Sequence, residues 1–228
     1  MVITDKMMHY RCAIPDPAKV KASTAPDWRD GFLFVGNQLA LDFLNTRLVQ
    51  NGEPLELIPD FHAVIRWFRA AGLLTSRQAG DIEQQWDGSP RARNFEAAIR
   101  RFRESLRKEI VAWGRTAKPS RGALEELNRL MADHPMLTRV RRGAHGTTAE
   151  SWFKASEPED VIAPLAHSAA TLFATGDRSR VRKCGNCVVH FYDTSKNGTR
   201  RWCSMQLCGN RSKVAAYAAR HRGADEAR

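Results

Sequence analysis

The sequence predicts an α+β protein, in which a helix-rich N-terminal domain with a small antiparallel hairpin precedes a small cysteine-rich module. Three observations support this class. Apolar residues recur at helical spacings of three and four over much of residues 36–134. The pattern changes to alternation within 136–155, and four of the five cysteines stand between Cys184 and Cys208. With 43% hydrophobic residues, the 228-residue chain can build a substantial core.

Residues 1–27 contain three prolines and no sustained periodicity, so we expect a mobile N-terminal arm. Cys12 lies in this arm and is interpreted as an incidental thiol without a partner. From Trp28 onward the pattern is helical. The first two predicted helices lie in GNQLALDFLNTRLVQ (36–50) and in PDFHAVIRWFRAAGLL (59–74), which opens on Pro-Asp.

The longest predicted helix lies in SPRARNFEAAIRRFRESLRKEIVAWG (89–114), which opens on Ser-Pro and has apolar residues three and four apart. SRGALEELNRLMADH (120–134) predicts another helix, which ends before a proline. MLTRVRRG (136–143) and TTAESWFKA (147–155) predict two antiparallel strands. A last helix is expected in 157–176, with acidic residues in its first turn and Gly176 as its stop signal.

Charge is distributed unevenly along the chain, which carries 36 Lys and Arg against 25 Asp and Glu. From Arg178 onward there are twelve basic residues against three acidic ones, so the first 177 residues are nearly neutral. A strongly basic C-terminal module is typical of a protein with a polyanionic partner, although a positive tail can also simply keep a protein in solution.

The sequence has no run of eighteen uncharged apolar residues and no continuous apolar stretch like that of a secretory signal. We therefore expect a soluble, cytoplasmic protein that does not associate with membranes. In that reducing compartment, clustered cysteines indicate metal ligands or redox groups rather than structural disulfides.

The cysteines of CGNCVVHFYDTSKNGTRRWCSMQLCGNR (184–211) form two pairs. Cys184 and Cys187 have the spacing that lets one tight turn present two thiolates to one ion. Fifteen residues separate this pair from Cys203 and Cys208. Four soft ligands suit one tetrahedral structural Zn²⁺, which helps a segment to fold when the segment is too small for its own core.

Other uses of four cysteines are less consistent with this pattern. A redox CxxC motif needs no second pair, and the spacing suits zinc better than an iron–sulfur cluster. We expect His190 to be a polar surface residue of a hairpin rather than a ligand. The seven histidines are scattered, so we predict no catalytic site in this module and no enzymatic activity.

Between the two pairs, an apolar run, the polar Asn197-Gly198 region and a second arm predict a hairpin. The alanine-rich sequence after Cys208 is compatible with a helix. The predicted unit is therefore a knuckle, a hairpin, a second ligand pair and a helix, as in a treble-clef or ribbon-like zinc finger.

Two motifs resemble a known family. CGNR at 208–211, preceded by RRWCSM and the CxxC knuckle, resembles the signature of the CGNR zinc-finger family of bacterial, stress-induced transcription regulators. LALDFLNT at 39–46 resembles the motif near the start of the ABATE domain, which precedes the finger in that family. The resemblance implies an ABATE-like domain at 28–176 for sensing or assembly, and a CGNR finger at 177–228 that binds DNA.

A helix after Cys208 would place cations and an aromatic residue on one face, and the hairpin tip would add further basic side chains. The candidate DNA contacts are Lys196, Arg200, Arg201, Arg211, Lys213, Tyr217 and Arg220. Alternatively, the finger docks on a protein partner, and Arg211 holds the finger together. A regulator that reads a two-fold symmetric site would often be a homodimer.

A second candidate site lies in the N-terminal domain, where polar residues interrupt an apolar segment. Asp42, Asn45 and Thr46, with Arg66, are candidates to grip a small-molecule effector. The alternative is that these residues cap a helix or tie neighbouring segments together. An enzyme centred on Asp42, with His62 or His167 as a base, is a further alternative.

Overall fold

The computed structural model describes residues 27–50, 53–116, 118–143, 146–210, 212–214 and 217. The predicted arm with Cys12, and also Arg211 and Arg220, lie outside these residues apart from Asp27. In chain order the elements are β1 (Trp28–Arg29), β2 (Phe32–Leu33), α1 (Leu39–Leu44), β3 (Arg47–Gln50), β4 (Glu53–Glu56), α2 (Phe61–Ala70), α3 (Ser76–Trp86), α4 (Pro90–Thr116), α5 (Arg121–Asp133), β5 (Leu137–Gly143), β6 (Gly146–Trp152), η1 (Pro158–Ile162), α6 (Ala163–Thr175), η2 (Arg178–Arg180), β7 (Val181–Lys183), β8 (His190–Tyr192) and η3 (Met205–Gly209).

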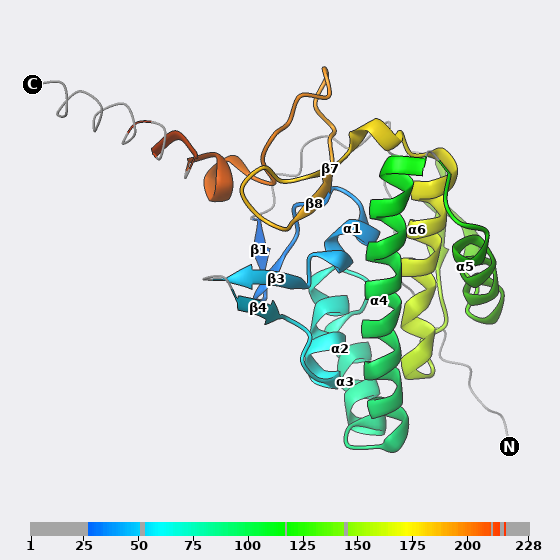
Figure 1. Ribbon diagram of the computed structural model, residues 1–228. Helices are drawn as coiled ribbons and strands as arrows, with labels where there is room; N and C mark the ends of the chain where they lie inside the picture. Colours follow the sequence, from blue (N-terminus) through cyan, green and yellow to red (C-terminus); the bar gives the residue numbers. More distant parts are fainter. Residues whose placement is uncertain are drawn as a thin grey trace, which may run out of the picture.

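The helices form one bundle, and within the described ranges the strands pair as antiparallel hairpins. Helices α4 and α6 run side by side, with α5 on the outer side of α6 and α2 and α3 towards one end (Figure 1). Helix α1 packs on both α4 and α6, and it also contacts β8. Among the described residues the sheets are β1-β2, β3-β4, β5-β6 and β7-β8. The predicted α+β class is confirmed.

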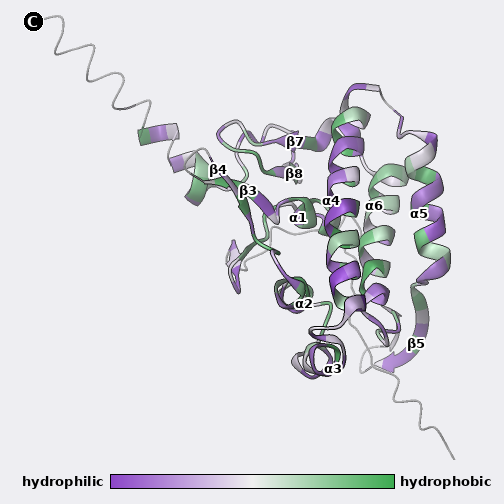
Figure 2. Ribbon diagram, turned by 60° about the horizontal axis from the view of Figure 1, so that its bottom comes forward, coloured by the Kyte–Doolittle hydropathy of each residue, from purple (hydrophilic) through white to green (hydrophobic). Residues whose placement is uncertain are grey.

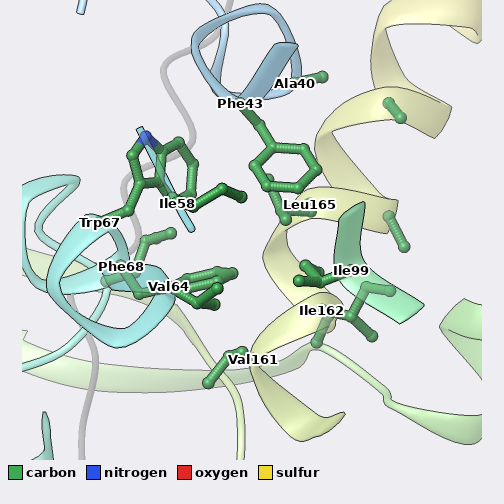
Figure 3. Close-up of a cluster of buried hydrophobic side chains, with 14 of the residues drawn as sticks. Ala40, Phe43, Ile58, Val64, Trp67, Phe68, Ile99, Val161, Ile162 and Leu165 are labelled. Carbon is green, nitrogen blue, oxygen red and sulfur yellow. The ribbon is translucent and has the colours of Figure 1, made fainter. Parts of the chain in front are cut away.

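The bundle encloses an apolar core to which α1, α2, α4 and α6 all contribute (Figure 3). Trp67 on α2 is almost fully buried, with its ring 5.3 Å from that of Phe43 on α1 and 5.1 Å from that of Phe68. Edge-to-face pairs of this kind add to the stabilisation from buried apolar area. Figure 2 shows hydrophilic residues along the outward faces of α4 and α5. No described helix has both the length and the apolar composition needed to cross a bilayer.

Local signals explain the helices that were predicted correctly. The Asp60 carboxylate accepts a hydrogen bond from the Ala63 amide at the start of α2, and the Ser120 hydroxyl caps α5 in the same way. Gly176 ends α6. The predicted hairpin is β5-β6, with Leu137 opposite Trp152 and Gly143 opposite Gly146.

The structure corrects the sequence analysis at the start of the domain. Residues 28–33 form a hairpin rather than helix, with Asp30 and Gly31 at positive φ (50° and 80°) in its two-residue turn. Asp-Gly is a strong signal for such a turn. The helix predicted in 36–50 ends at Leu44, and β3 follows.

This helix ends early because two polar side chains are drawn to other partners. Asn45 turns towards β8, and the Thr46 hydroxyl donates to the Phe43 carbonyl oxygen at 2.8 Å. Helix α3 was not predicted, although it opens with a capping box between Thr75 and Gln78.

Candidate metal centre

The four cysteines meet in one place. Their Sγ atoms all lie within 4.8 Å of one another, and Cys187 Sγ stands 3.8 Å from Cys203 Sγ. Four sulfurs bound at about 2.3 Å to one tetrahedral Zn²⁺ would be about 3.8 Å apart. Cys184, Cys203 and Cys208 are buried and Cys187 is partly accessible, so the shell is nearly closed, as in structural zinc sites.

The first ligand pair sits in the turn between β7 and β8. These strands pair with Lys183 opposite His190, and the Cys184 amide donates to the Val189 carbonyl at 2.8 Å. The hairpin therefore encloses the knuckle, whereas it was predicted after the knuckle, around Asn197-Gly198. The segment after β8 makes a turn at 195–198 and has no strand partner in the described chain.

The second pair flanks a helix start. The Ser204 hydroxyl accepts hydrogen bonds from the Gln206 and Leu207 amides, which caps the single π-helical turn η3 that carries Cys208. The Cys203 amide donates to Cys184 Sγ at 3.3 Å, which ties the two pairs together. Hydrogen bonds to ligand sulfur orient the ligands around an ion.

Two neighbours of the ligands have roles that the spacing did not reveal. The side-chain amide of Asn186 donates to the Cys208 carbonyl oxygen at 2.9 Å and so links the knuckle to η3. A Cβ at Gly185 would lie 2.8 Å from the Trp202 ring, so a glycine is needed where the indole packs on the knuckle.

The proximity of the thiols changes the pKa of three of them, Cys187, Cys203 and Cys208. Hydrogen bonding from Cys203 lowers the pKa of Cys187 to about 5, against the effect of burial. Hydrogen bonding with Cys187, followed by burial, raises the pKa of Cys203. Burial raises that of Cys208 to about 12. The Cys187 thiolate thus forms readily while Cys203 and Cys208 resist ionisation, and a divalent cation would relieve the repulsion between the thiolates.

Several arginines of the basic module hold the finger itself together. Arg200 donates to the carbonyl oxygens of Trp202, Cys203 and Val35, and its guanidinium lies 4.3 Å from the centre of the Phe191 ring. Arg180 donates to the carbonyl oxygen of Asp193 at 2.9 Å. These side chains supply hydrogen-bond donors to backbone carbonyl oxygens in loops.

A buried carboxylate organises the same loop. Asp193 accepts hydrogen bonds from the Ser195 and Arg200 amides at 2.9 and 2.8 Å, and Arg182 lies 3.5 Å away. Burial alone would raise the pKa of Asp193, but the bonds from Ser195 and Arg200 and the charge of Arg182 keep it below its ordinary value.

The remaining candidate DNA contacts fall into two groups. Lys196, Arg201, Lys213 and Tyr217 are exposed. The guanidinium of Arg201 lies 5.2 Å from the centre of the Trp202 ring. Arg211 and Arg220 lie outside the described residues.

Asp42, the first of the candidate effector residues, is engaged by backbone. Its carboxylate accepts a hydrogen bond from the Gly36 amide at 2.7 Å. Burial raises the pKa of Asp42 to about 7, although bonds from the Gly36 and Val35 amides and the charge of Arg29 oppose the rise.

Asn45 and Thr46 are also engaged within the fold. The Asn45 amide donates to the His190 carbonyl oxygen and accepts from the His190 amide, both at 2.9 Å. The Thr46 hydroxyl accepts from Arg103, a buried residue that also binds Glu56 through two nitrogens, at 2.7 and 2.6 Å.

Arg66 is held in a different set of contacts, since it bonds to the Asp30 carbonyl oxygen in the β1-β2 turn at 3.0 Å. Of the two candidate bases, His62 lies 3.2 Å from a Glu83 carboxylate oxygen, and His167 lies on α6. Together with the engagement of Asn45 and Thr46, this favours the structural interpretation of the LALDFLNT segment.

His190 was predicted to be exposed on the hairpin surface, but it is partly buried. Burial, with help from the charges of Arg107 and Lys183, lowers the pKa of its imidazole to about 4. The ring is therefore neutral at pH 7.

The finger and the helical domain share packing. Leu33 and Val35 are buried together with Val189, Phe191 and three of the cysteines, and Leu48 packs against this cluster. The Tyr192 amide also donates to the Gly36 carbonyl oxygen at 2.8 Å. The metal centre is thus built against the segment that precedes α1.

Comparison with protein families agrees with this geometry. The ABATE family, described as "Putative stress-induced transcription regulator", matches residues 37–176, and the CGNR zinc finger matches residues 180–221. None of the curated proteins compared with the chain matches it. The two family descriptions name a regulator and a zinc finger rather than an enzyme. With four cysteines arranged for one Zn²⁺, the family prediction is confirmed: the chain belongs to the ABATE family of transcription regulators and carries a CGNR zinc finger after its ABATE domain.

Proposed function

We propose that the protein is a cytoplasmic, zinc-dependent transcription regulator whose finger contacts DNA and whose helical domain senses an effector or mediates assembly. The zinc ion has a structural role. It fixes the knuckle against η3, so that the basic side chains around it keep a defined arrangement.

One observation carries this proposal: three exposed cations lie in the segment that holds the cysteines and η3. Lys196 lies in the 195–198 turn, Arg201 stands before Cys203, and Lys213 follows η3. No carboxylate in the described part of the chain pairs with any of the three, whereas Arg180 and Arg182 are held by the finger's own loop. Cations free of carboxylates are available to phosphates.

The salt dependence of binding tests this proposal. Zinc-loaded protein would be titrated with random and genomic duplex DNA over a salt series. Each lost phosphate contact should reduce the slope of log affinity against log salt by about 0.9. We expect the combined variant Lys196→Gln, Arg201→Gln, Lys213→Gln to lower affinity and to reduce this slope by about 2 to 3, with zinc content unchanged.

Arg121→Gln on α5 is the matched control, because this arginine is exposed and lies outside the finger. It should bind DNA like the original chain. Equal affinity of the triple variant and the original chain would place the DNA contacts elsewhere. Absence of binding at low salt would reject the DNA-binding function.

Exposed apolar side chains support a second candidate, a finger that docks on a protein. Met205, Val214 and Tyr217 are 50%, 67% and 58% exposed. Aromatic residues and methionine are enriched in protein interfaces. A protein partner would be retained at salt concentrations that abolish phosphate contacts, and Val214→Ser would weaken it. For a homodimer, light scattering should give twice the 25.7 kDa of one chain.

A further inference from the structure

A pocket of about 490 Å³ lies where the zinc finger meets the helical domain. Its lining residues come from α4 and hairpin β3-β4 of the helical domain, and from β7, Val188 and β8 of the finger. Its volume falls within the range of about 300 to 1,000 Å³ found for small-molecule sites. None of the candidate effector residues, Asp42, Asn45, Thr46 or Arg66, lines it.

The pocket carries an excess of positive charge. Arg47, Arg107, Arg115 and Lys183 line it, and among the described residues of its lining Glu104 is the only carboxylate. Arg47 and Arg107 both approach this carboxylate, at 3.6 and 3.5 Å, and Glu104 is also bonded by Arg103. Over the described ranges, no carboxylate pairs with Arg115 or Lys183.

The acidity of the lining groups agrees with this excess. Burial lowers the pKa of Arg107, and the charges of Arg103 and Arg47 lower it further against the opposing effect of Glu104. The imidazole of His190 is kept neutral by burial and by two lining cations, Arg107 and Lys183. An anion in the pocket would therefore relieve repulsion that is already present.

Apolar side chains alternate with these cations. Leu48, Val49, Val111 and Val188 line the same space. Val49 and Val111 are 47% and 40% exposed, although they are large aliphatic residues. A ligand that satisfies the whole lining needs an anionic head and an apolar body.

We propose that this pocket binds a small amphiphilic anion, with a carboxylate or phosphate head held by Arg115 and Lys183 and an aliphatic or aromatic body against Val49 and Val111. The ligand would touch α4 and β7 at once, so its affinity would depend on how the finger sits on the helical domain. The interpretation of the pocket as an effector site rests on the proposed regulator function, whereas the binding of the anion does not.

The apolar half of the lining distinguishes this ligand from DNA. A phosphate backbone needs cations and polar groups, and it would leave Val49 and Val111 uncovered. The test must therefore separate the contribution of the apolar body from that of the charge.

Isothermal titration calorimetry on the zinc-loaded full chain, without DNA, provides this test. The probes are butanoate, hexanoate, octanoate, octyl phosphate and octanol. We expect saturable binding at one site by octanoate or octyl phosphate, and the comparison of these two identifies the preferred head. Affinity should rise by up to about fourfold for each added methylene that is buried. Octanol, which lacks the charge, should bind at least about tenfold more weakly.

Variants connect the binding to the pocket. Arg115→Gln combined with Lys183→Gln should weaken octanoate binding about tenfold or more. The matched control Arg101→Gln, an exposed arginine of the same helix that does not line the pocket, should leave it unchanged. Arg115→Gln alone alters only an exposed side chain at the end of α4. If the double variant loses zinc, this single variant still tests whether octanoate binding depends on the pocket.

Three results would overturn the inference. One is the absence of saturable binding by octanoate and octyl phosphate at millimolar concentration. A second is binding that the pocket variants do not alter. The third is a probe affinity that does not depend on the length of the alkyl chain, combined with a loss of affinity for duplex DNA in the double variant. This combination would make the pocket a contact for DNA phosphates. Because the titration contains no DNA, its failure leaves the proposed DNA binding standing, and the reverse also holds.

Discussion

Asn45→Ala removes a two-point link between the helical domain and the finger. The Asn45 side chain is 1% exposed at the end of α1 and makes two hydrogen bonds of 2.9 Å to the backbone of His190 on β8. Alanine removes the donor and the acceptor together. Both backbone groups of His190 then lose their side-chain partner beside the metal centre.

The expected cost follows from these two contacts. A buried hydrogen-bonding group left without a partner costs about 1 to 3 kcal/mol, and water that enters the gap recovers part of this. We therefore expect Asn45→Ala to lower the free energy of unfolding by about 2 to 4 kcal/mol, of the 5 to 15 kcal/mol typical of a folded domain.

The measurement is urea denaturation of the full chain at fixed, saturating zinc, followed by tryptophan fluorescence and circular dichroism. Zinc must be held constant because a bound ligand adds its own stabilisation. The control is Asn128→Ala on the exposed side of α5. A change below about 0.5 kcal/mol for Asn45→Ala, as expected of an ordinary surface substitution, would refute the reasoning.

Asn45→Asp separates the donor from the acceptor. Aspartate retains the oxygen that accepts from the His190 amide but sets a carboxylate oxygen against the His190 carbonyl oxygen. We expect a loss of stability at pH 8 as large as that of alanine, and a smaller loss at pH 5, where the carboxyl can hold a proton and donate it. Equal losses at both pH values would argue against the two-point contact.

Two further predictions concern the metal centre and the carboxylate of Asp42. Cys203→Ser should abolish stoichiometric zinc binding. Because Leu33 and Val35 share the finger core, it should also increase hydrogen exchange in β2 as well as in the finger. The control Cys12→Ser should retain full zinc, and metal retained by the Cys203 variant would contradict the ligand assignment. Asp42 has its pKa raised to about 7 in the fold, so its contribution to stability is complete below the unfolded value near 4 and is lost as pH rises through 7. Between pH 5 and 8, the Asp42→Asn variant should therefore become more stable than the original chain, by at most about 4 kcal/mol. Thermal unfolding of both proteins over this pH range measures the effect, with the exposed Asp81→Asn as control. A difference in stability between variant and original chain that did not grow with pH would contradict the prediction.

Much of the architecture could be predicted from local patterns. The spacing of apolar residues located α2, α4, α5 and α6, and alternation located β5 and β6, because these elements bury one face over many residues. The short elements escaped for the opposite reason. In β1 and β2 two residues each give no period, and only the Asp-Gly turn signal of Asp30 and Gly31 marks them.

The candidate metal ligands were also predicted from sequence, because two close pairs of thiolates can serve one ion almost regardless of the surrounding fold. The roles of the other polar residues depended on partners far along the chain. Arg200 belongs to the predicted DNA contacts, yet its guanidinium reaches the carbonyl oxygen of Val35 across 165 positions. Likewise Asn45 reaches His190 across 145 positions.

Sequence alone thus determined the family, helices α2, α4, α5 and α6, and the four candidate zinc ligands, since each is encoded in residues close together along the chain. Only the tertiary structure decided that β8 pairs with β7, that the finger packs on Leu33 and Val35, and that Arg115 and Lys183 line one pocket. The physical reason is that long-range contacts depend on how whole elements dock, and a residue's type and neighbours do not specify which distant group it meets.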